Sequence, residues 1–132
     1  MNLNLTDKVI IVSGGAKGIG EGITQQLAQE GAIPVIIGRN EKDNKLCLEK
    51  IKKGFAIKAE LSNPADCKTA IDEALNKYGR IDGLVNNAGL NDGVGLENGN
   101  YEDFMKSLHN NLIHYYLLAH YALPALKISK GS

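Results

Sequence analysis

The chain has 132 residues, about the size of one domain, and its 43% content of hydrophobic residues is above the range of disordered proteins. Fifteen basic and fifteen acidic residues balance to a net charge of zero, and aromatic residues make up only 5%. This composition argues against nucleic acid and a membrane surface as partners, because binding to either is favoured by a basic surplus.

Strand and helix patterns alternate along the chain. In chain order we predict a strand at 8–13, a helix at 18–30, a strand at 32–38, a helix at 42–52, a strand at 54–59, a helix at 64–78, a strand at 81–85 and a helix at 101–127. Asn63 and Pro64 form a helix start, Gly79 forms a helix stop, and Pro124 is expected to bend or end the last helix. Such alternation is typical of parallel βαβ units with right-handed crossovers. We therefore predict one domain, 1–132, with a doubly wound, Rossmann-like α/β fold and the strand order third, second, first, fourth.

Glycines gather directly after the first predicted strand, in the stretch VSGGAKGIGEGI of residues 12–23. Ligands of parallel sheets bind beyond the carboxyl ends of the strands, and the N–H groups and dipole of a helix start favour an anion such as pyrophosphate. The spacing Gly14-x-x-x-Gly18-x-Gly20 differs from GxGxxG, and Glu21 stands where a P-loop requires lysine. Two interpretations therefore stand: a dinucleotide site, or a tight strand-to-helix turn without a ligand.

Three motifs occur in order: SGGAKGIG, NNAG at 86–89, and HNNL at 109–112 ahead of a helix that ends in ALP. This pattern resembles the short-chain dehydrogenase/reductase family over essentially the whole chain, and within it the sugar dehydrogenases of the L-fucose dehydrogenase type. The resemblance implies hydride transfer between a nicotinamide cofactor, NADP or NAD, and a secondary alcohol such as a sugar. It implies these cofactor-binding residues: Ser13, Gly14, Lys17, Gly18, Ile19, Gly20, Arg39, Glu60, Leu61, Asn87, Ala88 and Gly89. It also implies a catalytic role for Asn111, which would bend the last helix and anchor a water in the proton relay.

Lys17 and Arg39 bear on the choice of cofactor. NAD-selective sites of this kind place an acid at the end of the second strand, where it accepts from the ribose 2′-hydroxyl. That position is Gly38, and the guanidinium of the following Arg39 suits a phosphate in bidentate geometry. Lys17 would reach the same 2′-phosphate from the glycine loop. We therefore expect NADP rather than NAD; the alternative is that both are solvated surface charges, near Glu41 and Asp43.

The resemblance also indicates what the chain lacks. In the family a catalytic serine and a Tyr-x-x-x-Lys pair lie beyond the fifth strand, and this chain stops at 130–132, where that strand would begin. None of its five tyrosines is followed by lysine at the fourth place. We therefore expect a C-terminally incomplete, cofactor-binding half that is inactive alone, and a complete enzyme that is a homo-oligomer, dimer or tetramer, acting on a small-molecule alcohol. The alternative is a stand-alone nucleotide-binding or interaction module.

The remaining candidate residues support no other site. His109, His114 and His120 are five and six residues apart, which does not stack them on one helical face, so we predict packing or surface roles and no metal. Cys47 and Cys67 are predicted to be reduced thiols. No apolar run approaches the roughly 18 residues that cross a bilayer, and the start of the chain lacks a signal-peptide pattern, so a cytoplasmic location is expected.

Overall fold

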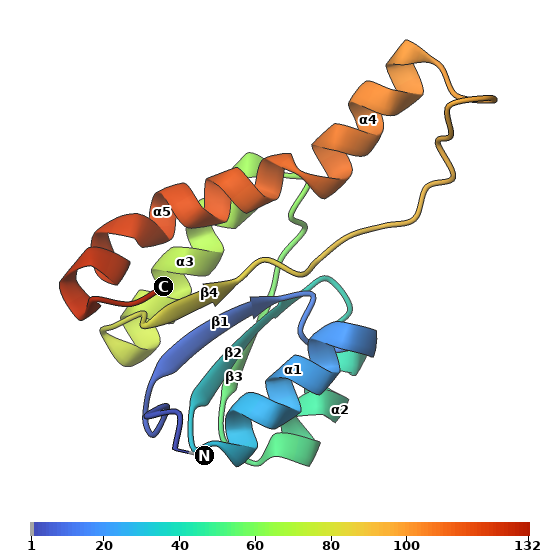
Figure 1. Ribbon diagram of the computed structural model, residues 1–132. Coiled ribbons are helices and arrows are strands. Elements are labelled where there is room, and N and C mark those ends of the chain that lie inside the picture. Colours follow the sequence, from blue (N-terminus) through green and yellow to red (C-terminus); the bar gives the residue numbers. More distant parts are fainter. Residues whose placement is uncertain (1) are drawn as a thin grey trace.

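The computed structural model describes residues 2–132, so Met1, which the predicted domain includes, lies outside it. Within these residues, four parallel strands form a sheet between two layers of helices (Figure 1). The strands are β1 (Val9–Ser13), β2 (Ile33–Gly38), β3 (Phe55–Lys58) and β4 (Gly83–Val85). The helices are α1 (Gly18–Gln29), α2 (Glu41–Ile51), α3 (Pro64–Tyr78), α4 (Tyr101–Asn111) and α5 (Ile113–Ser129).

The strand order is β3-β2-β1-β4, as predicted, which confirms the doubly wound α/β class. β1 lies between β2 and β4, with Ser13 paired to Ile37 on one side and Val12 paired to Val85 on the other. This register brings the carboxyl ends of β1, β2 and β4 to the same edge of the sheet. Any site built at that edge therefore draws on segments that are far apart in the sequence.

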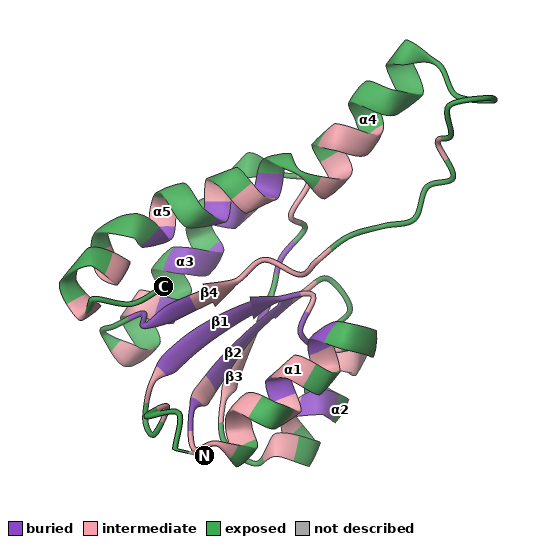
Figure 2. Cartoon of the chain, viewed as in Figure 1, coloured by how far each residue is buried: buried purple, intermediate pink, exposed green. Residues whose placement is uncertain are grey.

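The core forms because the central strands are apolar on both faces, as parallel strands require. Every residue of β1 is buried, and β2 is buried except at its two ends (Figure 2). α3 and α5 pack on one face of the sheet, and α1 and α2 cover the other (Figure 1). The helix layer over the first face supplies Cys67, Ala70, Ile71, Ala74, Leu118 and Ala122 to the core.

Local signals place the ends of α3 as predicted. The Asn63 side chain accepts a hydrogen bond from the N–H of Ala65 at 3.1 Å, and Pro64 is the first helical residue. Gly79 ends the helix with φ +72°, a conformation that favours glycine. Helix starts and stops of this kind depend only on neighbouring residues, which is why the sequence predicts them well.

The helix predicted at 101–127 is two helices, which meet directly after Asn111, the residue at which a bend was predicted. α4 ends at Asn111, Leu112 departs from helical geometry with φ −119°, and α5 begins at Ile113. The Asn111 side chain binds backbone outside its own helix, and such bonds compete with helix continuation. Pro124 lies inside α5, which continues to Ser129, so the helix does not end there.

The outer edge of β4 carries one further pairing. The N–H of Ser132 donates to the carbonyl oxygen of Asp82 at 3.2 Å, and the N–H of Leu84 donates to the carbonyl oxygen of Ser132 at 2.9 Å. These are the two bonds that a residue of a parallel neighbour makes with a strand.

Two other features of the described residues complete the fold. Cys47 and Cys67 are buried, and no disulfide joins them. Between residues 2 and 132 no helix combines the length and the apolar character needed to cross a bilayer.

Candidate functional site

A cavity of about 550 Å³ opens at the carboxyl edge of the sheet, between α1, α2 and the segment after β4. The predicted cofactor-binding residues that line it are Gly14, Lys17, Ile19, Gly20, Arg39, Glu60, Leu61, Asn87, Ala88 and Gly89. Ser13, Gly18 and Asn111 do not line it. The fold thus brings together residues from four separate stretches of the chain, at the place where parallel sheets bind ligands.

The turn from β1 into α1 forms the floor of the cavity. Gly14 has φ +64°, and its N–H donates to the carbonyl oxygen of Ile37 at 2.8 Å. A Cβ on Gly14 would lie 2.9 Å from Ala88 Cα, and a Cβ on Gly20 would overlap the carbonyl oxygen of Gly14. Gly14 is therefore required for its dihedral angles and Gly20 for a close approach. This tight turn brings the amino end of α1, whose first N–H groups have no intrahelical acceptor, to the cavity wall.

Ser13 lies beneath the cavity rather than on its wall. Its fully buried Oγ accepts hydrogen bonds from the N–H groups of Asn87 (3.0 Å) and Ala88 (3.1 Å) and donates to the carbonyl oxygen of Val85 (3.4 Å). In return, the Asn87 amide donates to the carbonyl oxygens of Ser13 (3.1 Å) and Gly14 (3.3 Å). These bonds fasten the segment after β4 to the end of β1. A direct contact between Ser13 and a cofactor stays a prediction.

Replacing Ser13 by alanine should lower the free energy of unfolding by about 2 kcal/mol, because the N–H groups of the half-buried Asn87 and Ala88 would lose their acceptor. Urea denaturation measures this change. Ser13→Thr is the matched control, since it keeps the hydroxyl and should lose less. If Ser13→Ala unfolds at the same urea concentration as the unaltered chain, the hydroxyl does not hold the two segments together.

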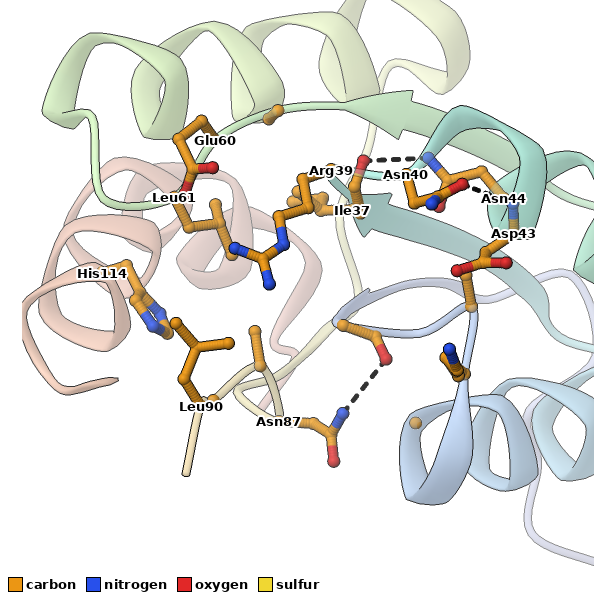
Figure 3. Close-up of a pocket in the computed structure, with 18 of the residues that line it drawn as sticks. Ile37, Arg39, Asn40, Asp43, Asn44, Glu60, Leu61, Asn87, Leu90 and His114 are labelled. Carbon is orange, nitrogen blue, oxygen red and sulfur yellow. Dashed lines mark hydrogen bonds between the residues drawn. The ribbon is translucent and has the colours of Figure 1, made fainter. Parts of the chain in front are cut away.

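One end of the cavity is mostly apolar and has a carboxylate at its rim. Leu61 and Leu90 lie on either side of the space, and Glu60 and His114 lie nearby (Figure 3). The N–H and Oγ of Ser62 both donate to Glu60 Oε1, at 3.3 and 3.0 Å. These bonds fold the glutamate side chain back on the chain. A flat ring that carries an amino group would find apolar contacts and an acceptor here.

His114 closes the same end of the cavity from the first turn of α5. It is 2% exposed, and its Nε2 donates to the carbonyl oxygen of Asn110 at 3.0 Å, which places the ring proton on Nε2. Burial lowers the pKa of His114, and this outweighs the Asn110 hydrogen bond and the Glu60 charge, which both raise it. The imidazole is therefore neutral at pH 7, in keeping with the packing role predicted for it.

The other end of the cavity carries charges of both signs. Lys17 precedes the first turn of α1, Arg39 follows β2, and Asp43 belongs to α2; all three line the cavity. Figure 3 shows Arg39 reaching from the end of β2 into the cavity, toward Leu61. Both basic side chains belong to exposed residues, so they can approach an incoming anion. A group with two negative charges would meet two cations and one carboxylate here.

Asn111 and Gly18 lie beside the cavity. The Oδ1 of Asn111 accepts from the N–H of Leu90 at 2.5 Å, and its Nδ2 donates to the carbonyl oxygen of Ser107 (3.1 Å) and to Asp92 Oδ2 (3.4 Å). Asn111 therefore ties the end of α4 to the loop after β4; its role in holding a water stays a prediction. Gly18 has φ +57°, and a Cβ there would meet no atom within 4 Å, so it borders open space at the start of α1.

Several residues line the cavity that were not among the predicted site residues: Asn40, Asn44, Ser62, Leu90, Asn110 and His114. Asn40, Ser62 and Leu90 each adjoin a predicted site residue, so adjacency along the chain could have found them. Asn44 and His114 are brought in by the docking of α2 and α5 on the sheet, and no motif marks them.

Comparison with known proteins identifies the family. Residues 8–132 match the family described as short chain dehydrogenase. L-fucose dehydrogenase of Bos taurus is 31% identical over 100% of this chain and 49% of its own length. The 11-beta-hydroxysteroid dehydrogenase A of Sesamum indicum is 29% identical over 97% of this chain and 38% of its own length. The chain belongs to the short-chain dehydrogenase family, and it spans less than half the length of these two relatives.

Solved structures of longer proteins share the fold. Cj0485 dehydrogenase superposes with a TM-score of 0.90 at 38% identity, over 99% of this chain and 51% of its own. NADH-dependent reductase A1-R′, complexed with NAD, superposes with a TM-score of 0.89 at 27% identity, over 98% of this chain and 56% of its own. The Pseudomonas aeruginosa RhlG/NADP active-site complex superposes with a TM-score of 0.86 at 29% identity, over 95% of this chain and 50% of its own. The chain therefore matches about half of each of these structures.

Proposed function

We propose that this chain is the cofactor-binding part of an NADP-preferring short-chain oxidoreductase whose substrate is a secondary alcohol, in particular a sugar such as L-fucose. The observation that carries the proposal is the cavity at the carboxyl edge of the sheet, where the glycine turn, the start of α1 and residues 86–89 meet. Membership of the short-chain dehydrogenase family supports the same class of reaction.

The cavity residues fit a dinucleotide. A volume of about 550 Å³ lies within the range of cofactor sites. The start of α1 suits a pyrophosphate, because its free N–H groups point outward and Gly18 places no side chain in the way. Leu61 and Leu90 would hold the adenine ring, with Glu60 accepting from its amino group. When bound, the nicotinamide supplies the carbon that takes or gives the hydride.

The residues around the end of β2 favour NADP over NAD. The position that holds an acid in NAD-selective sites is Gly38, and Lys17 and Arg39 flank it with positive charge. Two relatives of similar identity are described with NAD and with NADP respectively, so family membership alone leaves the choice open. We therefore base the preference on the two cations, which would bind a 2′-phosphate through charge-assisted hydrogen bonds.

Proton transfer is assigned to no residue of this chain. The Tyr-x-x-x-Lys pattern is absent from the 132 residues, and the relatives are about twice as long. We propose that residues 1–132 are the first part of a single, longer domain that supplies those groups. Asn111 would hold a water of the proton relay, since its amide lies at the helix break beside the loop after β4.

A polar second cavity supports a sugar over a steroid. It has a volume of about 260 Å³ and lies between the loop after β4 and α4. Its polar lining residues are Asp92, Asn98, Asp103, Lys106 and Asn110. Hydroxyl groups of a sugar would find both donors and acceptors among these side chains, whereas a steroid skeleton would desolvate them without compensation.

Exposed apolar residues on α4 and α5 support a homo-oligomer. Tyr101 is 72% exposed, Phe104 53% and Tyr116 67%, and Leu112 and Leu123 are about half exposed. Figure 1 shows α4 standing away from the body of the molecule, with one side of α5 free of other elements. A second subunit that covered these helices would remove this apolar surface from water.

A turnover assay tests the proposal. The 132-residue chain and a longer protein that contains it would be assayed with NADP and NAD against L-fucose, related sugars and a hydroxysteroid. We expect NADP-linked sugar oxidation by the longer protein and none by the chain alone. Turnover by the chain alone would contradict the missing proton-transfer pair. Steroid oxidation without sugar oxidation would contradict the substrate class, and cofactor binding without any turnover would favour a binding module.

In the longer protein, Asn111→Leu should lower kcat about tenfold or more, because the relay would lose the amide that orients its water. The Kd of NADPH should change less than twofold, since Asn111 does not line the cavity. Asn76→Leu, at an exposed position on α3, is the control and should leave both constants unchanged. A weaker Kd with unchanged kcat would instead indicate a purely structural role.

A further inference from the structure

Asn44 occupies the space beside the end of β2. It lies in the second turn of α2, lines the large cavity and is 4% exposed. Its Nδ2 donates to the carbonyl oxygen of Gly38 at 2.9 Å, which fixes the orientation of the amide because a carbonyl oxygen only accepts (Figure 3). Its Oδ1 is buried, and no donor within residues 2–132 reaches it.

A side chain at position 38 would require the Asn44 amide to move from its present place. A Cβ on Gly38 would overlap Asn44 Oδ1 and lie 3.3 Å from Asn44 Cγ. The backbone is not the obstacle, because Gly38 is not among the glycines with positive φ and pairs regularly with Lys58 of β3. Any residue could adopt the conformation of Gly38. The obstacle to a side chain at position 38 is therefore the neighbouring Asn44 amide.

We infer that Asn44 is a specificity-determining residue for the cofactor; this inference rests on the proposed function. An acid at position 38 would accept from the ribose 2′-hydroxyl of NAD and would repel the 2′-phosphate of NADP. Asn44 fills the space that this acid would need with an uncharged amide. The region around the ribose 2′ position is therefore left to Lys17 and Arg39, whose positive charges favour the 2′-phosphate of NADP.

A double-mutant cycle of Gly38→Asp and Asn44→Ala tests the inference. Thermal unfolding is measured without cofactor, and the Kd values of NADPH and NADH are measured for each variant. Gly38→Asp alone should lower the melting temperature by about 5 °C or more, because the new side chain overlaps the amide. The double variant should melt above Gly38→Asp and prefer NADH at least tenfold more than the unaltered protein does. Gly22→Asp is the control for charge, since a Cβ at Gly22 meets nothing within 4 Å.

Each outcome decides the question. If Gly38→Asp is as stable as the unaltered protein and changes cofactor preference as much as the double variant, Asn44 excludes nothing and the inference is wrong. If the single variant does not fold, Gly38→Ala provides the same cycle with only a Cβ added. A further outcome is that the effects of the two substitutions on the melting temperature are non-additive while no variant binds either cofactor. In that case the overlap between position 38 and Asn44 is real, but both the selectivity role and the proposed function are overturned. Cofactor binding with no coupling would overturn the inference alone.

Discussion

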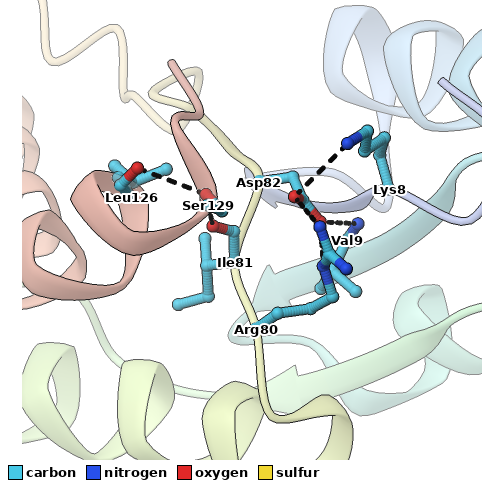
Figure 4. Close-up of polar contacts among 7 residues, drawn as sticks. All are labelled: Lys8, Val9, Arg80, Ile81, Asp82, Leu126 and Ser129. Atoms are coloured by element: carbon cyan, nitrogen blue, oxygen red, sulfur yellow. Dashed lines mark hydrogen bonds and ion pairs between the residues drawn. The ribbon is translucent and has the colours of Figure 1, made fainter. Parts of the chain in front are cut away.

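Asp82→Ala is expected to lower the free energy of unfolding by about 3 kcal/mol, because it removes a buried carboxylate that accepts from the half-exposed Arg80 and from the N–H of the buried Val9. The Asp82 side chain is 5% exposed at the start of β4. It accepts from Arg80 Nε (2.8 Å), Arg80 Nη2 (2.6 Å) and the N–H of Val9 (2.9 Å), with Lys8 Nζ at 3.9 Å (Figure 4). Asp82 therefore ties the start of β4 to the start of β1.

Urea denaturation measures this loss, and Asp72→Ala is the matched control. Asp72 pairs with Lys68 one helical turn away on α3, and both side chains are more than half exposed. An exposed pair of this kind contributes about 0.3–0.5 kcal/mol, so the control should be nearly as stable as the unaltered chain. Equal losses in the two variants would contradict the structural role given to Asp82.

The loss caused by Asp82→Ala should depend on pH. Burial raises the pKa of the Asp82 carboxyl, but the Arg80 and Val9 hydrogen bonds and the charges of Arg80 and Lys8 more than offset it and hold the pKa below 3.8. A carboxyl with a lowered pKa stabilises the fold above its unfolded pKa and loses that stabilisation as the pH falls through the folded one. The difference between the two proteins should be constant from about pH 5 to 7 and shrink below about pH 3.8. A difference that grows on acidification would contradict the pairing.

The second large effect is expected for Arg39→Asp, which should weaken NADP at least tenfold more than NAD. A hydrogen bond to a charged group contributes about 1.5–3 kcal/mol, and the new carboxylate would repel the 2′-phosphate as well. The same carboxylate could accept from the 2′-hydroxyl of NAD, so the affinity for NAD should decrease little. Isothermal titration with both cofactors measures the ratio.

Lys45→Asp is the control for this charge reversal. Lys45 is exposed on α2 and does not line the cavity, so its replacement changes the net charge equally without removing a predicted phosphate contact. It should alter the cofactor ratio by less than a factor of two. If Arg39→Asp and Lys45→Asp shift the ratio equally, Arg39 acts only through the general field of the protein.

Local patterns explain why so much of the fold could be predicted. Unbroken β-branched runs indicate buried parallel strands, and the cap at Asn63 and the stop at Gly79 depend on adjacent residues only. The glycines after β1 predicted the position of the cavity, because they indicate a sharp strand-to-helix turn at the carboxyl edge, where parallel sheets bind ligands. The strand order then followed from the usual topology of such sheets.

Contacts between distant segments explain what could not be predicted. The resemblance placed a bend at Asn111, but the full break there involves a bond to Leu90, which is 21 residues away, and no helical pattern contains that information. The predicted contact of Ser13 with a cofactor stays a prediction, but the bonds of its hydroxyl to backbone groups 72 to 75 residues away could not be foreseen from the sequence. The overlap of Asn44 with position 38 likewise appears only when α2 is docked on β2.

The most direct test of the account is a titration of the ¹⁵N-labelled chain with NADPH, followed residue by residue through its amide signals. We predict saturable shifts confined to the carboxyl edge, in residues 14–20, at Arg39, at Leu61 and in residues 86–90. The signals of the carboxyl-terminal half of α3, which runs away from this edge of the sheet, should stay in place. No saturable change, or changes centred on α3, would contradict the assignment of this cavity as a dinucleotide site.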